Sequence, residues 1–206
     1  GYIELNRRNG LPSSGEPDTF NFAVAGLSGE LHNDGTGVYH SRTETLYREF
    51  RKTAAGGWEM RDGQGNRYLF GSSTNSRINN AAGYLDSVTD GSGNQILYNY
   101  MQNLGAFYPS SITYTGYNGT PGPNTGNFTY ETRTDVRNTF RHAVSETRQL
   151  RLKTIDSDFA TMNFLTRRYR MTYGLTSSGQ SVVTRIDLLG ADGTSTIPLR
   201  VMSYSI

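Results

Sequence analysis

Two runs of alternating apolar and polar residues, each with an Asp-Gly-x-Gly-Asn pentapeptide, limit the possible folds of this chain most strongly. The pentapeptides occupy residues 62–66 and 90–94. On the arm before the first, Trp58 and Met60 alternate with charged residues. A period of two places successive side chains on opposite faces of a strand. Each run therefore predicts a strand, a tight turn and a second strand.

The pentapeptides also contain oxygen donors for calcium and glycines that suit a phosphate loop. An EF-hand loop needs further carboxylates and a distal Glu, and a phosphate loop needs a helix with Lys or Ser/Thr. Neither copy supplies these groups. Turn chemistry alone accounts for the pattern, because Asp bonds the backbone ahead and Gly and Asn adopt positive φ. We therefore predict turns, without metal or cofactor, at Asp62, Gly63, Gly65, Asn66, Asp90, Gly91, Gly93 and Asn94.

The composition is typical of an all-β protein. Of 206 residues, 24 are Gly and 14 are Tyr, and only 34% are apolar. The stretch from Asn138 to Arg151 is compatible with either a short helix or another hairpin. We expect one β-rich domain over 1–206, an antiparallel twisted sheet or hairpin array that forms a curled sheet or a β-sandwich. Its core should contain the faces formed by Trp58, Met60, Tyr68 and Phe70 and by Ile96, Tyr98 and Tyr100.

Composition also excludes several classes of protein. The chain has no Cys, which excludes disulfides, thiolate metal sites and a cysteine nucleophile. A net charge of +2 is too small to predict nucleic-acid binding. No apolar run approaches the roughly 18 residues of a membrane span. The chain begins at Gly1 within a pattern and without a signal peptide, so we expect a fragment of a larger protein.

The three histidines, His32, His40 and His142, are the first candidates for chemistry. The even separation of His32 and His40 would place both on one face, but zinc needs at least one further ligand. A Ser-His-Asp triad can assemble across a fold, yet the chain has no G-x-S-x-G elbow. We interpret these histidines as surface or loop residues and predict that the chain is not an enzyme.

Two charged patterns are further candidates for a site. Asp156 and Asp158 lie two apart, as in a glycosidase or cation site, but solvated acids of a turn are more common. Arg168 and Arg170 flank Tyr169, as in proteins that bind single-stranded nucleic acid. Period two places both arginines on one face, so we interpret this run as an amphipathic strand with a solvated basic face.

Aromatic residues offer one further candidate. Trp58 and Tyr117 could stack on a sugar ring, because flat aromatic faces bind sugars while polar edges bind hydroxyls. The alternation of Trp58 with Met60 favours a place in the core instead.

The segment from Tyr84 to Tyr100 resembles the YD or RHS repeat, in which an arm ending near Asp is followed by Gly-Asn and an aromatic arm. The segment from Trp58 to Gly71 is similar to the one that precedes it in toxin-complex B components. Further segments resemble the family in the same order: Arg8 to Pro12, Asp18 to Phe20, Gly29 to Leu31, Tyr108 to Thr115, Tyr130 to Asp135, Arg185 to Gly193 and Ser203-Tyr204.

Nearly the whole chain is thus similar to the virulence-plasmid B-type domain of insecticidal toxin-complex B components and related RHS polymorphic toxins. The resemblance implies a β-rich section of a large secreted or surface bacterial protein. In relatives, such sections help to build a hollow β shell that encloses a toxic C-terminal segment, or that joins a propeller to it. The tandem repeats, the self-cleaving aspartyl protease region and the toxic domain of the family do not occur in these 206 residues. No catalytic residue therefore carries over.

The resemblance predicts a non-catalytic structural module without cofactors. Its partners would be the remainder of the parent polypeptide or a toxin-complex subunit, with no nucleic acid and no membrane span. The alternative is a carbohydrate-binding or adhesin-like module of a bacterial surface protein, with Trp58 and Tyr117 in contact with a glycan.

Overall fold

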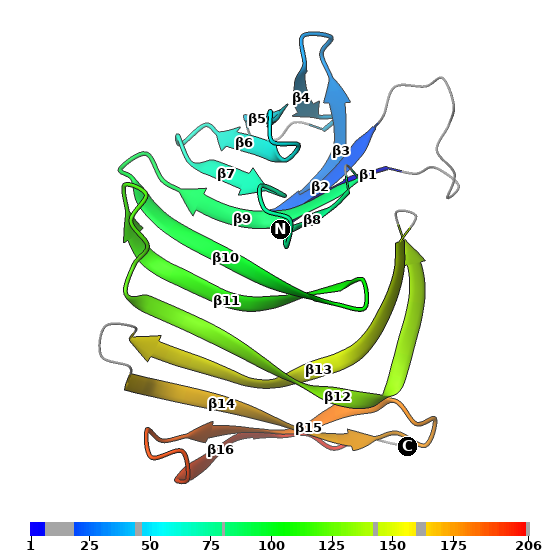
Figure 1. Ribbon diagram of the computed structural model, residues 1–206, viewed down its shortest axis with the longest axis vertical. Coiled ribbons are helices and arrows are strands. Elements are labelled where there is room, and N and C mark those ends of the chain that lie inside the picture. The colour runs from blue at the N-terminus through cyan, green and yellow to red at the C-terminus, as the bar shows by residue number, and fades with distance from the viewer. Residues whose placement is uncertain (7–18, 44–46, 80, 142–143, 160–163, 205–206) are drawn as a thin grey trace. The chain divides into compact units, whose positions relative to one another are not determined.

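All regular elements of the described chain are β-strands (Figure 1). The computed structural model describes residues 1–6, 19–43, 47–79, 81–141, 144–159 and 164–204. The all-β class and the antiparallel pairing are therefore confirmed. Between 138 and 151, strands β12 (Asn124–Arg141) and β13 (Val144–Phe159) pair with each other, so the hairpin alternative is correct and the helix is wrong.

The chain folds as two compact units, and the boundary between them falls inside strands. The first unit comprises Gly1–Tyr98 with Tyr117–Gly119, and the second comprises Asn99–Gly116 with Thr120–Ile206. Strand β10 (Asn94–Asn103) and strand β11 (Ala106–Tyr117) therefore each belong to both units. Because continuous strands connect the units, no linker of distinctive composition marks the boundary in the sequence.

The first unit is a closed barrel. Its strands follow one another as antiparallel neighbours: β1 (Tyr2–Leu5), β2 (Phe20–Val24), β3 (Leu27–Asn33), β4 (Val38–Ser41), β5 (Arg48–Lys52), β6 (Trp58–Asp62), β7 (Arg67–Phe70) and β9 (Ala82–Thr89). Strand β1 pairs with β9 and closes the ring, so these strands leave no free sheet edge between them. The short strand β8 (Arg77–Ile78) pairs with β9.

Strand β9 both closes the barrel, by pairing with β1, and continues the sheet, by pairing with β10. Residues Ala82–Tyr84 pair with β1, whereas Ser87–Thr89 pair with β10. On the opposite edge of β9, β8 and β7 pair in succession. One strand therefore has four neighbours.

The barrel interior is filled by alternate residues of its strands. In β2, for example, Phe20, Phe22 and Val24 are buried and the residues between them are only half-buried. The ring centroids of Phe20 and Trp58 lie 4.8 Å apart, and those of Phe22 and Phe50 lie 4.9 Å apart. The core cluster consists of Ile3, Phe20, Phe22, Val24, Leu31, Tyr39, Phe50, Trp58, Met60, Phe70 and Leu85. Of the expected core residues, Tyr68, Ile96, Tyr98 and Tyr100 are only half-buried.

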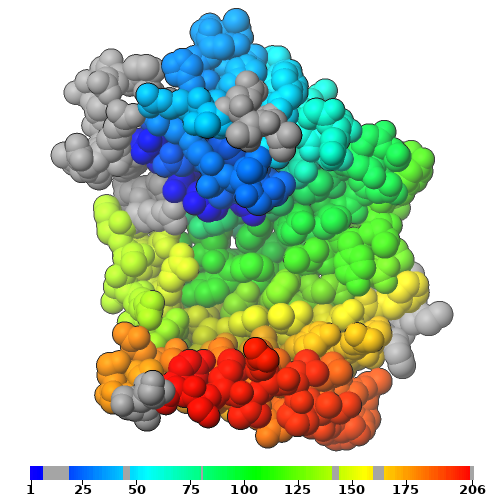
Figure 2. Space-filling view, turned by 180° about the vertical axis from the view of Figure 1, so that it is seen from behind, coloured from blue at the N-terminus to red at the C-terminus, as the bar shows by residue number. Residues whose placement is uncertain are grey.

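The second unit is an antiparallel meander of long strands. After β11 come β12, β13, β14 (Phe164–Leu175), β15 (Ser181–Leu189) and β16 (Thr196–Val201), each paired with the next. Strand β16 is last in this order, and all six of its residues are exposed. Its alternating apolar residues, Ile197, Leu199 and Val201, lie open to solvent, and the surface of this strand is drawn in red in Figure 2.

Several hairpins turn through two residues that both have positive φ, the geometry of a type I′ turn. Asn118-Gly119 is the sequence this turn favours, whereas Ala25 and Leu104 adopt φ of 50° and 47° without that advantage. In each pair the second residue is Gly, which adopts positive φ without strain.

Candidate functional site

The first pentapeptide forms a turn around the carboxylate of Asp62. Its Oδ1 accepts hydrogen bonds from the amides of Gln64 (3.0 Å) and Asn66 (2.9 Å), and its Oδ2 accepts one from Asn66 Nδ2 (2.9 Å). The Asp62 amide donates to the Asn66 carbonyl, and Gly65 has a φ of 82°. The oxygens that would bind a cation are therefore already hydrogen-bonded within the turn.

The second pentapeptide repeats this geometry. The Asp90 carboxylate accepts from the amides of Ser92 and Asn94, both at 2.9 Å, and from Asn94 Nδ2 at 2.7 Å. Here the turn is also covered, because the Asn118 amide donates to the Gly93 carbonyl at 2.9 Å. A Cβ on Gly93 would overlap Asn118 Oδ1. Gly93 is thus required by its neighbour as well as by its φ of 91°.

We expect the Asp62→Asn substitution to lower the free energy of unfolding by about 1 kcal/mol at pH 7. An amide nitrogen would then face the Asn66 side-chain donor in this half-exposed turn. Burial alone would raise the pKa of Asp62, but hydrogen bonds from Asn66, Gln64 and Tyr68 outweigh it and lower the pKa. A lowered pKa stabilises the fold above the unfolded value of about 3.9, and this contribution is lost as pH falls through the folded pKa.

The difference between wild type and Asp62→Asn should therefore shrink in acid. Urea unfolding at pH 7 and pH 3, followed by the fluorescence of the single Trp58, measures it. Gln64→Ala is the matched control within the turn. Gln64 donates to Asp62 through its backbone amide, which the substitution keeps. Equal stability of wild type and Asp62→Asn at pH 7 would contradict this account of the turn.

Trp58 and Tyr117, the candidate sugar contacts, lie in different environments. Trp58 is 6% exposed, and its ring packs at 4.9 Å from Tyr39, so it offers no open face to a sugar. Tyr117 is 58% exposed beside the second pentapeptide.

The Lys52 ammonium lies 4.6 Å from the Phe20 ring centroid and 5.6 Å from that of Trp58, which adds cation–π attraction over the aromatic cluster.

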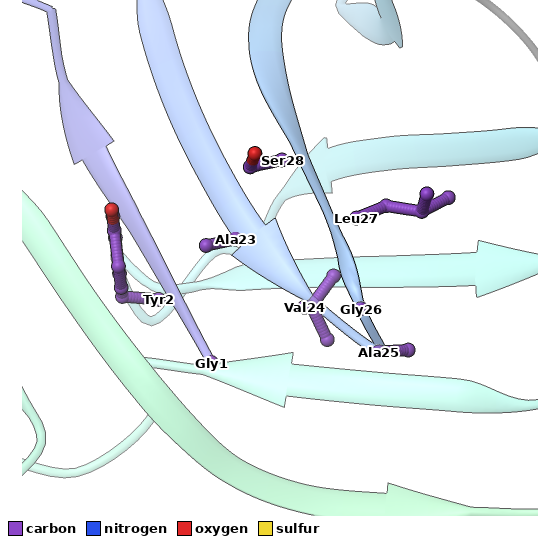
Figure 3. A pocket seen from close by; sticks show the side chains of 8 residues that line it. All are labelled: Gly1, Tyr2, Ala23, Val24, Ala25, Gly26, Leu27 and Ser28. Atoms are coloured by element: carbon purple, nitrogen blue, oxygen red, sulfur yellow. The ribbon is translucent and has the colours of Figure 1, made fainter.

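A pocket of about 450 Å³ lies where the β2–β3 hairpin meets the start of β1 (Figure 3). Its polar side chains are Tyr2 and Ser28, and the rest of its wall is small or aliphatic, including Val24 and Leu27. These groups offer hydroxyls but no carboxylate or imidazole. The pocket therefore carries no evident chemistry.

His32 and His40 share a face, as their even separation predicts. They lie on the neighbouring strands β3 and β4 as directly opposite partners. His40 Nε2 lies 3.9 Å from Asp34 Oδ2 in the turn between these strands. His142 lies outside the described residues, as do residues 8–12 and Asp18 of the resembling segments.

The charged residues of the second unit pair across strands. Asp156 is 7% exposed, and Arg168 Nε donates to its Oδ1 at 2.7 Å. Asp187 is 2% exposed and lies 3.5 Å from Arg170. Asp158 is half-buried, and its carboxylate accepts a hydrogen bond from the side-chain amide of Asn127 on the neighbouring strand β12. The interpretation of Asp156 as a solvated acid is therefore wrong. The basic face of β14 is partly solvated, because the Arg168 and Arg170 side chains are 35% and 42% exposed while each pairs with an Asp on a neighbouring strand.

A polar network that the sequence does not reveal is centred on Asp135 of β12. Asp135 accepts from Arg133 on its own strand and from the Ser181 amide of β15 at 2.9 Å. Arg151 of β13 donates to Ser181 Oγ at 3.0 Å and lies 4.3 Å from the Tyr173 ring centroid. Because β13 and β14 separate β12 from β15 in the sheet order, these bonds join strands that are not neighbours.

The sheet of the second unit curls enough to bring β12 and β15 together, since Asp135 and Ser181 are hydrogen-bonded although two strands lie between theirs in the sheet. Hydrogen bonds from Arg133 and Ser181 lower the pKa of Asp135, so the carboxylate is charged at neutral pH. No spacing in the sequence signals the pairing of Asp135 with Ser181, which lie 46 residues apart.

Within the described parts of the chain, no three His, Asp or Glu side chains converge as metal ligands. The described residues also include no helix long and apolar enough to cross a membrane.

No known protein-family profile matches the chain, and no curated protein is similar to it in sequence. Solved structures do match. The crystal structure of TcdB2-TccC3 has a TM-score of 0.72 at 15% identity, over 96% of this chain and 14% of that chain. The Tc holotoxin pore of Photorhabdus luminescens has a TM-score of 0.72 at 15% identity, over 96% and 13%.

A shorter structure matches over most of both chains. The N-terminal domain of effector protein SpvB from Salmonella typhimurium strain LT2 has a TM-score of 0.71 at 14% identity. The match covers 92% of this chain and 86% of that one. The chain therefore shares the fold of toxin-complex components, and it spans about an eighth (13%) of the TcdB2-TccC3-Cdc42 chain that it also matches. At the level of the fold, the expected resemblance is confirmed.

Proposed function

We propose that the chain is a structural module of a secreted or cell-surface RHS/YD-repeat toxin-like protein. In this role its sheet contributes to a β shell that encloses or presents a toxic or effector region. The observation that carries the proposal is the shared fold, which extends over 96% of the chain in the toxin-complex structures. The small share of those longer chains that it spans supports a role as part of a larger polypeptide.

The polar networks of the second unit suit a shell wall. A wall one sheet thick has water or cargo on both faces, so it cannot rely on a thick apolar core. Ion pairs such as Arg168–Asp156 and the Asp135–Ser181 bonds hold strands together without an apolar cover. The carboxylates are partnered by cations or hydroxyls, which satisfies the groups that burial would otherwise make unfavourable.

Strand β16 is the proposed junction with the rest of the parent polypeptide. Ile197, Leu199 and Val201 are 48–68% exposed along a strand that pairs only with β15 in the described chain. An open edge with apolar side chains readily accepts a further strand. We therefore propose that another segment of the parent covers this edge.

Hydrogen exchange tests the junction. In the 206-residue chain, the β16 amides that face away from β15 should exchange quickly, because an amide without a backbone hydrogen bond exchanges without opening of the strand. In the longer polypeptide of the same reading frame, their protection should rise about 10-fold or more, which corresponds to at least about 1.4 kcal/mol. The amides of β13, which already pairs with β12 and β14, serve as the internal control and should not change.

Equal exposure of β16 in both polypeptides would contradict the junction. A glycan titration separates the remaining alternative: saturable binding that Tyr117→Ala abolishes would favour the carbohydrate-binding module. Retained shell assembly of the parent after removal of this module would contradict the structural role itself.

A further inference from the structure

The outer face of the barrel presents two imidazoles side by side. His32 of β3 and His40 of β4 are directly opposite in an antiparallel pair, which places their Cβ atoms about 4.5–5.5 Å apart. The adjacent residues Leu31 and Tyr39 are buried in the core cluster. Because successive side chains alternate between faces, His32 and His40 both point away from the barrel interior.

A carboxylate accompanies this pair. Asp34 Oδ1 accepts from the Thr36 amide (2.8 Å) and from Thr36 Oγ1 (2.7 Å), which fixes the carboxylate in the turn between β3 and β4. Its Oδ2 lies 3.9 Å from His40 Nε2. This distance is too long for a hydrogen bond, so Asp34 contributes its negative charge beside the imidazole, which favours a cation there.

The surface above the two imidazoles is concave. A cavity of about 550 Å³ is lined by His32, His40, Thr19, Glu30 and Arg42, among others. The cation of Arg42 would repel a metal ion, but Glu30 Oε2 lies 3.5 Å from Arg42 Nη1 and offsets its charge. The cavity therefore combines two nitrogen ligands with oxygen groups and room for water.

We propose that His32 and His40 form a binding site for a divalent late transition-metal ion, with the negative charge of Asp34 beside His40 and water completing the coordination. Imidazole suits copper, nickel and zinc. No third His, Asp or Glu in the described residues completes a closed site, so the ion would be exchangeable rather than structural. This inference goes beyond the proposed structural role and does not depend on it.

Calorimetric titration of the untagged chain with CuCl₂ and with ZnCl₂, in a buffer that does not chelate metals, tests the site. We expect one ion per chain, bound more tightly for Cu²⁺ than for Zn²⁺, as the general order of affinities requires. His32→Gln with His40→Gln should abolish this binding. Asp34→Asn should weaken it about 5-fold, because a unit negative charge close to the ion is lost.

His142→Gln is the matched control and should bind as the wild type does. Because His32 and His40 point outward, the melting temperature without metal should be unchanged in the double His variant, which shows that its loss of binding is not loss of folding. Electron paramagnetic resonance of the Cu²⁺ complex should show two nitrogen ligands. Unchanged binding in the double variant, loss of binding in His142→Gln, or binding only at millimolar metal would each overturn the proposal.

Discussion

The Phe50→Ala variant should lose about 3–5 kcal/mol of the free energy of unfolding of the first unit, the usual cost of removing a fully buried aromatic ring. Phe50 is 0% exposed at the centre of the barrel, and its ring lies 4.9 Å from that of Phe22. Truncation to Ala leaves a cavity that the closed ring of strands cannot fill by collapsing, because each strand is held by neighbours on both sides.

Trp58 makes this loss measurable. The only tryptophan of the chain packs in the same core, so its fluorescence during urea unfolding follows the first unit. Phe140→Ala is the matched control, because Phe140 is 76% exposed on β12 of the second unit. It should leave the Trp58 transition unchanged. A loss of less than about 1 kcal/mol for Phe50→Ala, far below the usual range, would contradict a tightly packed barrel core.

The Gly105→Ala variant should destabilise the second unit by roughly 2–5 kcal/mol, the sum of left-handed strain and overpacking. Gly105 has a φ of 78°, and a Cβ there would overlap the Ser145 carbonyl oxygen of β13. The turn cannot move away easily, because the Thr147 amide donates to the Leu104 carbonyl at 2.9 Å. The obstacle is backbone rather than a flexible side chain.

Gly179→Ala separates the two causes. Gly179 lies in the same unit with a φ of 76°, but nothing lies within 4 Å of its would-be Cβ. It should cost only about 1–2 kcal/mol, the strain of the left-handed conformation. Hydrogen exchange of β11 and β13 amides measures both variants. Equal costs for the two glycines would show that the Leu104-Gly105 turn does not pack against β13 as described.

Local pattern was enough to predict the strands. The alternation around Trp58 and Met60 predicts a strand with one buried face, and both side chains are in the core. The Asp62 and Asp90 pentapeptides are sites where the chain reverses direction, with each Asp bonded to the residues just ahead of it. These features depend on residues within a few positions of one another, which is why a single sequence reveals them.

The pairing of side chains across strands cannot be predicted from local sequence pattern. Arg168 and Arg170 look like a solvated basic face until β13 and β15 bring Asp156 and Asp187 beside them. His32 and His40 become a pair only because a tight turn aligns β3 with β4. The residues in these pairs lie 8–17 positions apart, so their contact depends on the register between strands rather than on spacing along one strand.

Secondary structure and turns thus follow from the side-chain period of two and from the φ preferences of Asp, Gly and Asn, which act over a few residues. Closure of the barrel depends instead on contacts between residues far apart in the sequence. It needs Tyr2 to pair with Tyr84, and the curl of the second unit needs Asp135 to meet Ser181. Such contacts join segments 82 and 46 positions apart. Their formation depends on the twist and register accumulated over all intervening strands, which no local pattern encodes.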